Sequence, residues 1–239
     1  LNFQHGDPLA LADNVFYFKR TLREAALKHD MYATFMAKPM AGEPGSAMHV
    51  HQSVNDLATG RNIFTDADGA SSQHFRHYIG GLQRYTPAAM AILAPYVNSY
   101  RRMVRHTAAP INVQWGIDNR TVGFRIPISG TGQRRVENRI IGADANPYLA
   151  MAVTLACGYL GMVDQIDPSP MVTGSAYDHD HELPQGLPQA LEGLRREDRL
   201  RDILGERFID VYTAIKELEH QEFMTVISPW EREHLLLHV

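Results

Sequence analysis

Cysteine is almost absent from the sequence, since Cys157 is the only one among 239 residues. A single thiol excludes an internal disulfide framework, the usual support of small secreted domains, and favours a reducing, cytoplasmic location. Cys157 also falls within an apolar run of helical type. We therefore expect a buried, unreactive thiol rather than a nucleophile.

Long hydrophobic runs and an excess of positive charge are absent as well. The longest apolar run, residues 149–163, has 15 residues and two glycines, whereas a membrane-spanning helix needs about 20. The first residues lack the basic and apolar regions of a signal peptide. The net charge of −4 argues against general nucleic-acid binding. We expect a soluble protein without a membrane or nucleic-acid partner.

Several common catalytic motifs are missing too. The sequence contains no Walker loop, no GxGxxG, no GxSxG and no HExxH. A nucleotide would therefore bind outside the common phosphate-cradling folds, and neither a hydrolase elbow nor a zinc protease motif is supported.

Polar side chains are instead gathered on strand-like segments. In a β-strand, side chains two residues apart share a face. Three segments with such polar faces predict one shared active site. They are residues 48–54 with His49, His51 and Ser53, residues 121–126 with Arg125, and residues 135–139 with Arg135, Glu137 and Arg139.

His49 and His51 have the spacing of a metal-binding pair, because imidazoles two residues apart on a strand can converge on one cation. Gly45, just upstream, lets the backbone approach a ligand closely. Glu137 would add the hard oxygen ligand that Mg²⁺ or Mn²⁺ prefers. With 12 histidines in the chain, a chance pair is the alternative.

Arginine is the basic residue around these segments, because residues 40–208 contain no lysine. A guanidinium binds carboxylate and phosphate groups through two parallel hydrogen bonds. A metal beside several arginines is what phosphoryl transfer from ATP requires. On spacing alone, structural salt bridges explain the arginines equally well. The arginines in question are Arg102, Arg120, Arg125, Arg135 and Arg139.

Strands mixed with helices, followed by helices alone, indicate an α+β fold. Asp7 and Pro8 begin a helix that we expect to end near His29. The other expected helices are residues 75–93, with Pro87 starting a second segment, then 147–162, 189–204, 206–224 and a short one after Pro229. The expected strands are residues 31–36, 48–54, 121–128 and 134–141, and long connections are expected at residues 55–72 and 164–187.

In their order along the chain, these motifs resemble the glutamine synthetase family. Residues 36–53 resemble its ATP-binding signature, and further family motifs follow at residues 98–102, 118–120, 125–127, 135–139 and 145–150. The resemblance covers essentially the whole chain. It implies a glutamine synthetase-type catalytic domain, with helices flanking a curved antiparallel sheet, and ATP-dependent activation of glutamate as a γ-glutamyl phosphate.

The resemblance also implies a role for each matching residue. His49 and Glu137 would bind the Mg²⁺ or Mn²⁺ that bridges the ATP phosphates. His51 and Ser53 would contact the nucleotide, together with Arg125 and Arg135. The residues that hold glutamate would be Gly45, Arg102 and Arg139, and those that stabilise the transferring phosphoryl group would be Arg120, Arg125 and Arg135.

Within the family, residues 5–10, 142–147 and 228–233 are most similar to the γ-glutamylpolyamine synthetase branch. In ammonia-using members a flap glutamate closes over the ammonium pocket, whereas Ala108 stands at the matching position here. Without that carboxylate, ammonium loses a partner and a base, and a larger amine gains space. This favours putrescine or another alkyl amine, with an ammonia-using glutamine synthetase as the alternative.

The resemblance implies parts that this chain lacks. The family has an N-terminal β-grasp domain, further metal-binding glutamates upstream, and stacked rings of subunits with active sites between neighbours. We therefore expect residues 1–239 to be the C-terminal part of the catalytic domain, truncated at its N-terminus and inactive alone. The full-length protein is expected to be a homo-oligomer.

Two other classes of protein were weighed against a ligase. A cupin-like metal oxygenase also carries His-x-His on a strand, but it needs a glutamate soon afterwards, where Asn55 and Asp56 stand. A non-catalytic fragment or paralogue with an assembly or regulatory role is the second. The retained His49, Glu137 and arginines argue against it.

Overall fold

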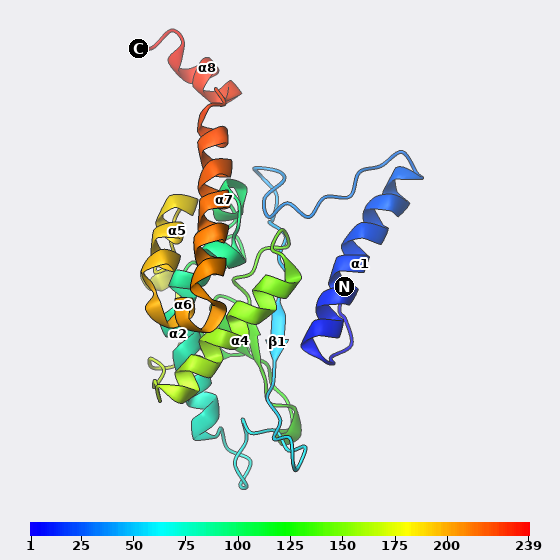
Figure 1. Ribbon diagram of the computed structural model, residues 1–239, viewed down its shortest axis with the longest axis vertical. Coiled ribbons are helices and arrows are strands. Elements are labelled where there is room, and N and C mark those ends of the chain that lie inside the picture. Colours follow the sequence, from blue (N-terminus) through cyan, green and yellow to red (C-terminus); the bar gives the residue numbers. More distant parts are fainter.

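A four-stranded sheet lies at the centre of the computed structural model, which describes residues 1–239 (Figure 1). Its strands are β1 (Val50–Gln52), β2 (Trp115–Ile117), β3 (Phe124–Ile126) and β4 (Val136–Asn138), in the order β1-β4-β3-β2. The predicted antiparallel pairing holds for β1, β4 and β3, whereas β2 lies parallel to β3 and makes the sheet mixed. The sequence analysis did not predict β2. It connects to β3 through only a short loop, in which Asp118 turns the chain with φ 47°.

The chain also forms eight α-helices. They are α1 (Pro8–Leu27), α2 (Gln73–Leu93), α3 (Val97–Tyr100), α4 (Pro147–Val163), α5 (Leu187–Arg196), α6 (Asp198–Leu204), α7 (Glu206–Met224) and α8 (Pro229–Leu235). Capping explains where two of the predicted helices begin, because Asp7 and Asn146 accept hydrogen bonds from the first backbone N–H groups of α1 and α4. In both helices proline follows directly, where its missing N–H costs nothing.

Three of the predicted elements are wrong in detail. Residues 31–36 form no strand, because no neighbouring strand pairs with them, and Tyr32 is exposed. Helix α2 continues through Pro87 because both of its halves pack into one core. The predicted helix 189–204 is divided at Glu197, whose backbone is extended and whose carboxylate lies 2.9 Å from Nη1 of Arg84.

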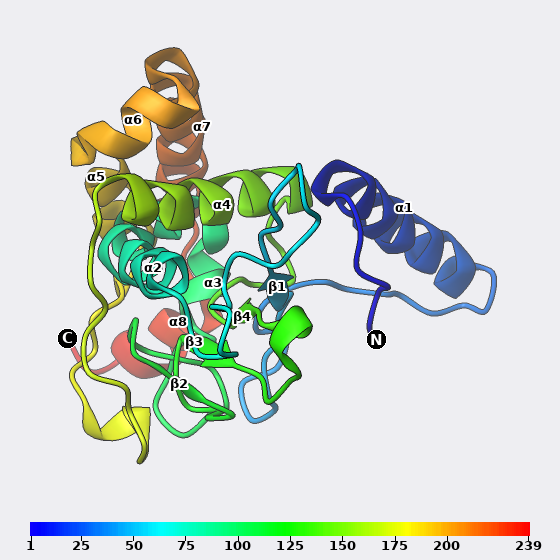
Figure 2. The same ribbon diagram turned by 90° about the horizontal axis from the view of Figure 1, so that it is seen from below.

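The hydrophobic core lies between one face of the sheet and helices α2 and α4, as Figure 2 shows. Val50, Phe124, Ile126 and Val136 are the strand residues that contribute to it. Helices α2 and α4 approach so closely that a Cβ atom at Gly81 would lie 2.5 Å from Cα of Gly161. Glycine at the crossing therefore allows α2 and α4 to pack closely as one layer against the sheet. The opposite face of the sheet carries polar side chains.

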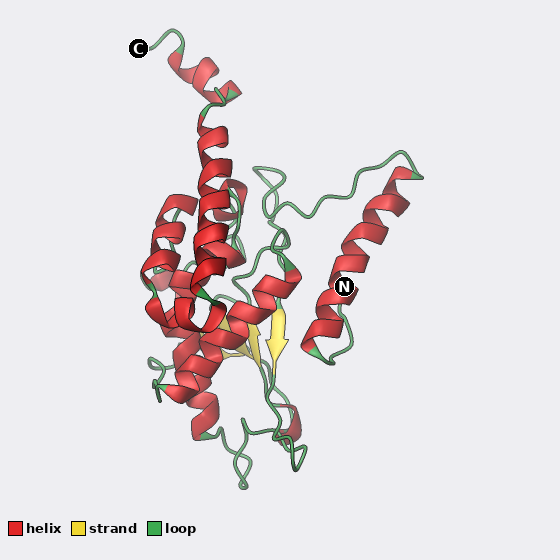
Figure 3. Cartoon of the chain, in the orientation of Figure 1, coloured by secondary structure: helices red, strands yellow, loops and turns green.

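The two ends of the chain lie away from this core (Figures 1 and 3). Helix α1 lies beyond the β1 edge of the sheet and is attached to α4, because Oη of Tyr148 donates to Asp13 at 2.6 Å. Helices α7 and α8 extend from the other side of the helical layer. None of the helices combines the length and the apolar composition that crossing a lipid bilayer requires.

Candidate active site

Three neighbouring strands bring His51, Glu137 and Arg125 side by side. In the register of the sheet, Glu137 of β4 pairs with His51 of β1 and with Arg125 of β3. Directly paired residues point to the same face of a sheet. The three side chains therefore form one polar row on the face opposite the hydrophobic core.

Glu137 is the centre of this row, with only 2% of its surface exposed. Its Oε2 accepts a hydrogen bond from Nη1 of Arg125 at 2.6 Å. Its Oε1 lies 3.0 Å from Nη1 of Arg139 and 3.0 Å from Nδ1 of His49. Nε2 of His51 is 4.0 Å from the same oxygen. Four predicted site residues thus surround a fifth.

The charges around Glu137 fix its protonation state. Burial alone raises the pKa of a carboxyl group, but hydrogen bonds from His49 and Arg125 and the charge of Arg139 hold the pKa of Glu137 far below its usual value. Glu137 is therefore an anion at neutral pH. Burial lowers the pKa of His51, against the attraction of Glu137. The His51 imidazole is consequently neutral at pH 7 and has a lone pair available for a ligand.

Asp118 extends the row beyond the predicted residues. Its Oδ1 accepts a hydrogen bond from Nε of Arg125 at 3.0 Å, so the guanidinium lies between Asp118 and Glu137. Burial lowers the pKa of Arg125, but the hydrogen bonds of these two carboxylates outweigh burial and raise it. Arg125 is thus a permanent cation in a fixed position. The only sequence signal for Asp118 was its place in the motif at residues 118–120.

Arg102 and Gly45 form the adjoining part of the site. Arg102 is 4% exposed and donates a hydrogen bond to the carbonyl oxygen of Ile140, the residue after Arg139. A Cβ atom at Gly45 would lie 2.5 Å from Cγ of Arg102 and 2.6 Å from the carbonyl oxygen of Ala37. Only glycine fits there, so Gly45 allows the Arg102 stem to pack against the backbone.

Three predicted residues lie outside this network. Ser53 follows β1 and Arg120 follows β2, and both are exposed. Arg135 precedes β4, and its Nη1 donates to the carbonyl oxygen of Gln133 at 3.2 Å rather than to Glu137. The roles assigned to these three residues stay predictions.

The donor atoms of the row fit a divalent cation as one side of a larger site. His49 Nδ1 and Glu137 Oε1 lie 3.0 Å apart on one face, and both atom types are suitable ligands for Mg²⁺ or Mn²⁺. No group of three or more His, Cys, Asp or Glu side chains is arranged to hold a metal ion. Mg²⁺ usually takes few protein ligands and keeps waters and substrate phosphates, so the residues that could hold such an ion here are His49 and Glu137.

The segment around Ala108 has an unusual backbone. His106 and Ala108 have φ values of 63° and 61°, in the left-handed region that most side chains avoid. Arg105 holds the segment in place by donating hydrogen bonds to the carbonyl oxygens of Tyr177 and His179, the latter at 3.1 Å. Ala108 itself is exposed. The segment therefore presents a methyl group and no carboxylate to solvent.

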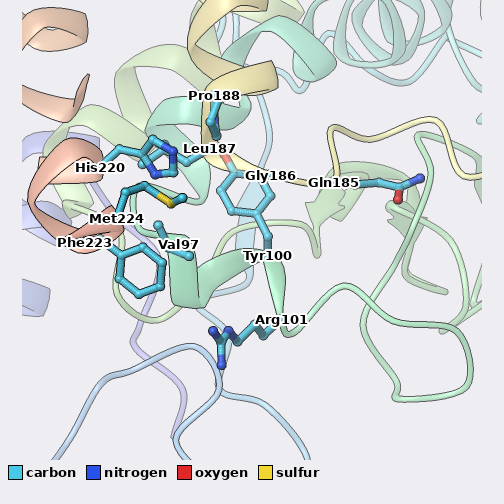
Figure 4. A pocket seen from close by; sticks show the side chains of 10 residues that line it. All are labelled: Val97, Tyr100, Arg101, Gln185, Gly186, Leu187, Pro188, His220, Phe223 and Met224. Carbon is cyan, nitrogen blue, oxygen red and sulfur yellow. The ribbon is translucent and has the colours of Figure 1, made fainter. Parts of the chain in front are cut away.

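The hollow drawn in Figure 4 is separate from these residues. It has a volume of about 370 Å³ and lies between α3, the C-terminal end of α7 and residues 185–188. Arg101 borders this hollow, whereas Arg102, the next residue, is buried against the sheet. No predicted site residue lines the hollow. The candidate site is thus the polar row on the sheet and not this cavity.

Comparison with known proteins identifies the family. Residues 1–235 match the family model described as "Glutamine synthetase, catalytic domain". The chain belongs to this family. It is 40% identical over 239 residues to gamma-glutamylputrescine synthetase PuuA of Escherichia coli (strain K12). The aligned region covers 99% of this chain and 50% of PuuA. The similarity to a γ-glutamylpolyamine synthetase, predicted from three short segments, is therefore confirmed.

Other relatives of this chain carry names that refer to different reactions within the glutamine synthetase family. Glutamate–isopropylamine ligase of Pseudomonas sp. is 38% identical over 237 residues, covering 97% of this chain and 51% of that protein. Glutamine synthetase of Methanosarcina mazei is 35% identical over 247 residues, covering 99% and 55%. The chain thus spans about half the length of the curated relatives it matches.

A solved structure confirms the predicted glutamine synthetase-type fold. Apo GmaS without ligand superposes with a TM-score of 0.89 at 32% sequence identity, covering 99% of this chain and 55% of GmaS. The GmaS/ADP complex superposes with the same TM-score of 0.89.

Proposed function

We propose that the intact protein containing this chain is an ATP-dependent ligase that joins the γ-carboxylate of glutamate to an amine, with putrescine or another alkyl amine as the acceptor. The observation that carries the proposal is the buried Glu137 anion, held between His49, Arg125 and Arg139 on one face of the sheet. Similarity to PuuA and to glutamate–isopropylamine ligase supports the choice of reaction.

His49 and Glu137 are the residues that would hold Mg²⁺ or Mn²⁺. When bound, the ion supplies positive charge that neutralises the ATP phosphates. His51, which is paired directly with Glu137 across β1 and β4, and Ser53 beyond it would contact the nucleotide. The neutral His51 imidazole suits this role because it can accept or donate a hydrogen bond.

The arginines divide between the phosphoryl group and glutamate. Arg125 is fixed by two carboxylates and so provides a rigid cation for the transferring phosphoryl group, with Arg120 and Arg135 completing the positive surroundings. The buried Arg102 and Arg139 would bind carboxylate oxygens of glutamate. Gly45 leaves the space that the Arg102 stem requires.

The proposed reaction has two steps. An oxygen of the glutamate γ-carboxylate attacks the γ-phosphorus of ATP, the bond to the bridging oxygen breaks, and ADP leaves. The neutral amine then attacks the carbonyl carbon of γ-glutamyl phosphate, and inorganic phosphate leaves with the bonding electrons. The amine nitrogen loses one proton, which passes to phosphate or to solvent, and the γ-glutamyl amide remains.

Residues 1–239 constitute, in this proposal, the C-terminal part of the catalytic domain. The remaining metal ligands and an N-terminal β-grasp domain belong to the part of the protein upstream, and neighbouring subunits in stacked rings complete each site. The two-ligand set of His49 and Glu137 is consistent with this division, since it leaves coordination positions for other groups. The isolated chain is expected to be inactive.

Putrescine is expected to support ADP release from glutamate and ATP with a kcat/KM at least about tenfold above that for ammonium, because Ala108 offers no carboxylate to ammonium. The measurement is ADP release by the intact protein with Mg²⁺ and each amine. Ala108→Glu is expected to reduce the preference for putrescine. Ala108→Gly, which suits the φ of 61° and adds no charge, is the matched control and should retain it.

Preference for ammonium would contradict the amine assignment and favour an ammonia-using glutamine synthetase, which the 35% identity to the Methanosarcina mazei enzyme supports as the second candidate. Absence of ADP release with every amine would contradict the ligase proposal and favour a non-catalytic protein with an assembly or regulatory role.

A further inference from the structure

The polar excursion of residues 55–72 holds the turn that precedes β4. That turn, residues 130–134, contains Gly130 and Gly132, and a Cβ atom at either would meet no atom within 4 Å. These glycines therefore serve no close packing and leave the turn flexible by composition. Side-chain hydrogen bonds nevertheless tie the turn to the excursion, which lies beside it at the lower end of the molecule in Figure 1.

The excursion donates hydrogen bonds to the backbone of the turn. Nδ2 of Asn62 donates to the carbonyl oxygen of Arg134 at 2.8 Å, and Oγ1 of Thr65 donates to that of Thr131 at 2.7 Å. The carbonyl oxygen of Gly132 lies 3.4 Å from the same Nδ2 of Asn62. Backbone carbonyl groups along the whole turn are thus held in place.

Arg134 fastens the turn from the other side. Its Nη1 donates to Oγ of Ser71 at 2.7 Å, and its Nη2 donates to the carbonyl oxygen of Gly69 at 3.0 Å. Arg135 differs, because its guanidinium donates only to the carbonyl oxygen of Gln133, at 3.2 Å. Of these two adjacent arginines, Arg134 is committed to the structure, whereas Arg135 keeps most of its donors for a ligand.

The excursion is itself anchored in the hydrophobic core. Phe64 is fully buried, and its ring centroid lies 4.8 Å from that of Phe75. Oδ1 of Asn62 accepts a hydrogen bond from the backbone N–H of Phe64 at 2.9 Å. The two ends of one amide group therefore connect the core to the peptide group that joins Arg134 to Arg135.

Arg135 lies at the approach to the polar row. The backbone of Arg134 is extended, with φ −62° and ψ 130°, and Val136 is already paired with Gln52 of β1. Arg135 therefore continues the alternation of β4 and shares the face of Glu137, two residues further on. Rotation of the peptide group before Arg135 would turn its side chain away from the row.

We propose that Asn62 is a positioning residue that fixes the direction of Arg135 by holding the peptide group before it, while Thr65 completes the hold on the turn. The inference rests on the proposed function, because it takes Arg135 as a cation for the transferring phosphoryl group. It assigns a role to the excursion of residues 55–72, which contributes no side chain to the polar row.

The test is Asn62→Ala in the intact protein, with ADP release measured from glutamate, ATP, Mg²⁺ and putrescine. kcat is expected to fall about tenfold, whereas the KM for glutamate should change less than about twofold. Thr65→Val removes one hydroxyl group at nearly constant size and should lower kcat about threefold. Thr59→Val is its matched control, because Oγ1 of Thr59 also donates at 2.7 Å, but to Asp56 within the excursion. The control should keep kcat within about twofold of the wild type.

Arg135→Gln separates positioning of Arg135 from general support of the fold. This variant is expected to lower kcat about 100-fold. Adding Asn62→Ala to it should lower kcat less than about twofold further, because the guanidinium that Asn62 positions is no longer present. A purely structural role of Asn62 predicts instead the same loss of about tenfold with or without Arg135.

An unchanged kcat in Asn62→Ala, or the full loss of about tenfold in the Arg135→Gln background, would overturn the inference. Wild-type kcat in Arg135→Gln would overturn it as well, since no side chain would need positioning. If thermal unfolding shows that Asn62→Ala does not fold, Thr65→Val takes its place in the same comparison. Its loss of about threefold should then disappear beside Arg135→Gln, and persistence of that loss is the contrary result. Absence of wild-type turnover with every amine would instead refute the proposed function.

Discussion

Replacing Glu137 by glutamine is expected to lower kcat/KM for the ligase reaction by at least about 1,000-fold and the free energy of unfolding by about 3 kcal/mol. Glu137 is 2% exposed and is the common partner of His49, Arg125 and Arg139. A neutral amide leaves two guanidiniums without their shared counter-ion and removes the carboxylate that is proposed as a metal ligand. Steady-state kinetics and denaturant unfolding measure the two effects.

The pH dependence of this difference has a definite sign. Because the folded-state pKa of Glu137 is depressed, its charge stabilises the folded protein above the unfolded pKa, near 4.5, and this stabilisation is lost as the pH falls. The difference in unfolding free energy between wild type and Glu137→Gln should therefore be largest at neutral pH and shrink below about pH 4.5. The surface variant Glu217→Gln, which affects an exposed pair with Arg195, is the control and should cost less than about 1 kcal/mol. Equal losses from the two variants would contradict the central role of Glu137.

Substituting Gly45 by alanine is expected to raise the KM for glutamate by about tenfold or more. The new methyl group would lie 2.5 Å from Cγ of Arg102 and 2.6 Å from the carbonyl oxygen of Ala37. The carbonyl belongs to backbone that also accepts the N–H of Ser46 at 2.8 Å, so it cannot retreat easily. Arg102 must then shift, and a small displacement of a positioning group is sufficient to reduce substrate binding strongly.

Gly42→Ala is a matched control in the same loop, because a Cβ atom at Gly42 would meet no atom within 4 Å. Its kinetics and thermal stability should remain close to those of the wild type. A similar increase in the glutamate KM for both variants would indicate a general effect of loop stiffness and would contradict the assignment of Gly45 to the Arg102 site. Thermal unfolding of each variant separates a local change from loss of the fold.

The polar faces of individual strands could be predicted from the sequence, because alternation in a strand depends only on local geometry. His49 and His51, and Glu137 with Arg139, were recognised in this way. Their meeting at one carboxylate could not be deduced from alternation, since β1 and β4 are more than eighty residues apart in sequence and only register decides which residues face each other. The resemblance to a known family, and not the alternation, predicted that His49 and Glu137 lie together.

Features that depend on a specific partner escaped prediction. Residues 31–36, which were predicted as a strand, have no neighbouring strand to pair with, and the break at Glu197 accompanies a hydrogen bond from the distant Arg84. Asp118 became interpretable only once the parallel pairing of β2 and β3 placed it beside Arg125. The helix-breaking tendency of Pro87 inside α2 was outweighed by the packing of the residues on both sides of it. Local sequence patterns therefore predicted most helices and strands, whereas the departures from these predictions depend on contacts between residues far apart in the sequence.

Oxygen transfer from glutamate to phosphate is the measurement that tests the account most directly. The intact protein would be given glutamate labelled with ¹⁸O in the γ-carboxylate, together with ATP, Mg²⁺ and putrescine, and the released phosphate would be analysed by mass spectrometry. Formation of γ-glutamyl phosphate predicts one labelled oxygen in each phosphate released with an amide. Phosphate released without label, or an amide formed without phosphate, would contradict the proposed chemistry at Glu137 and its arginines.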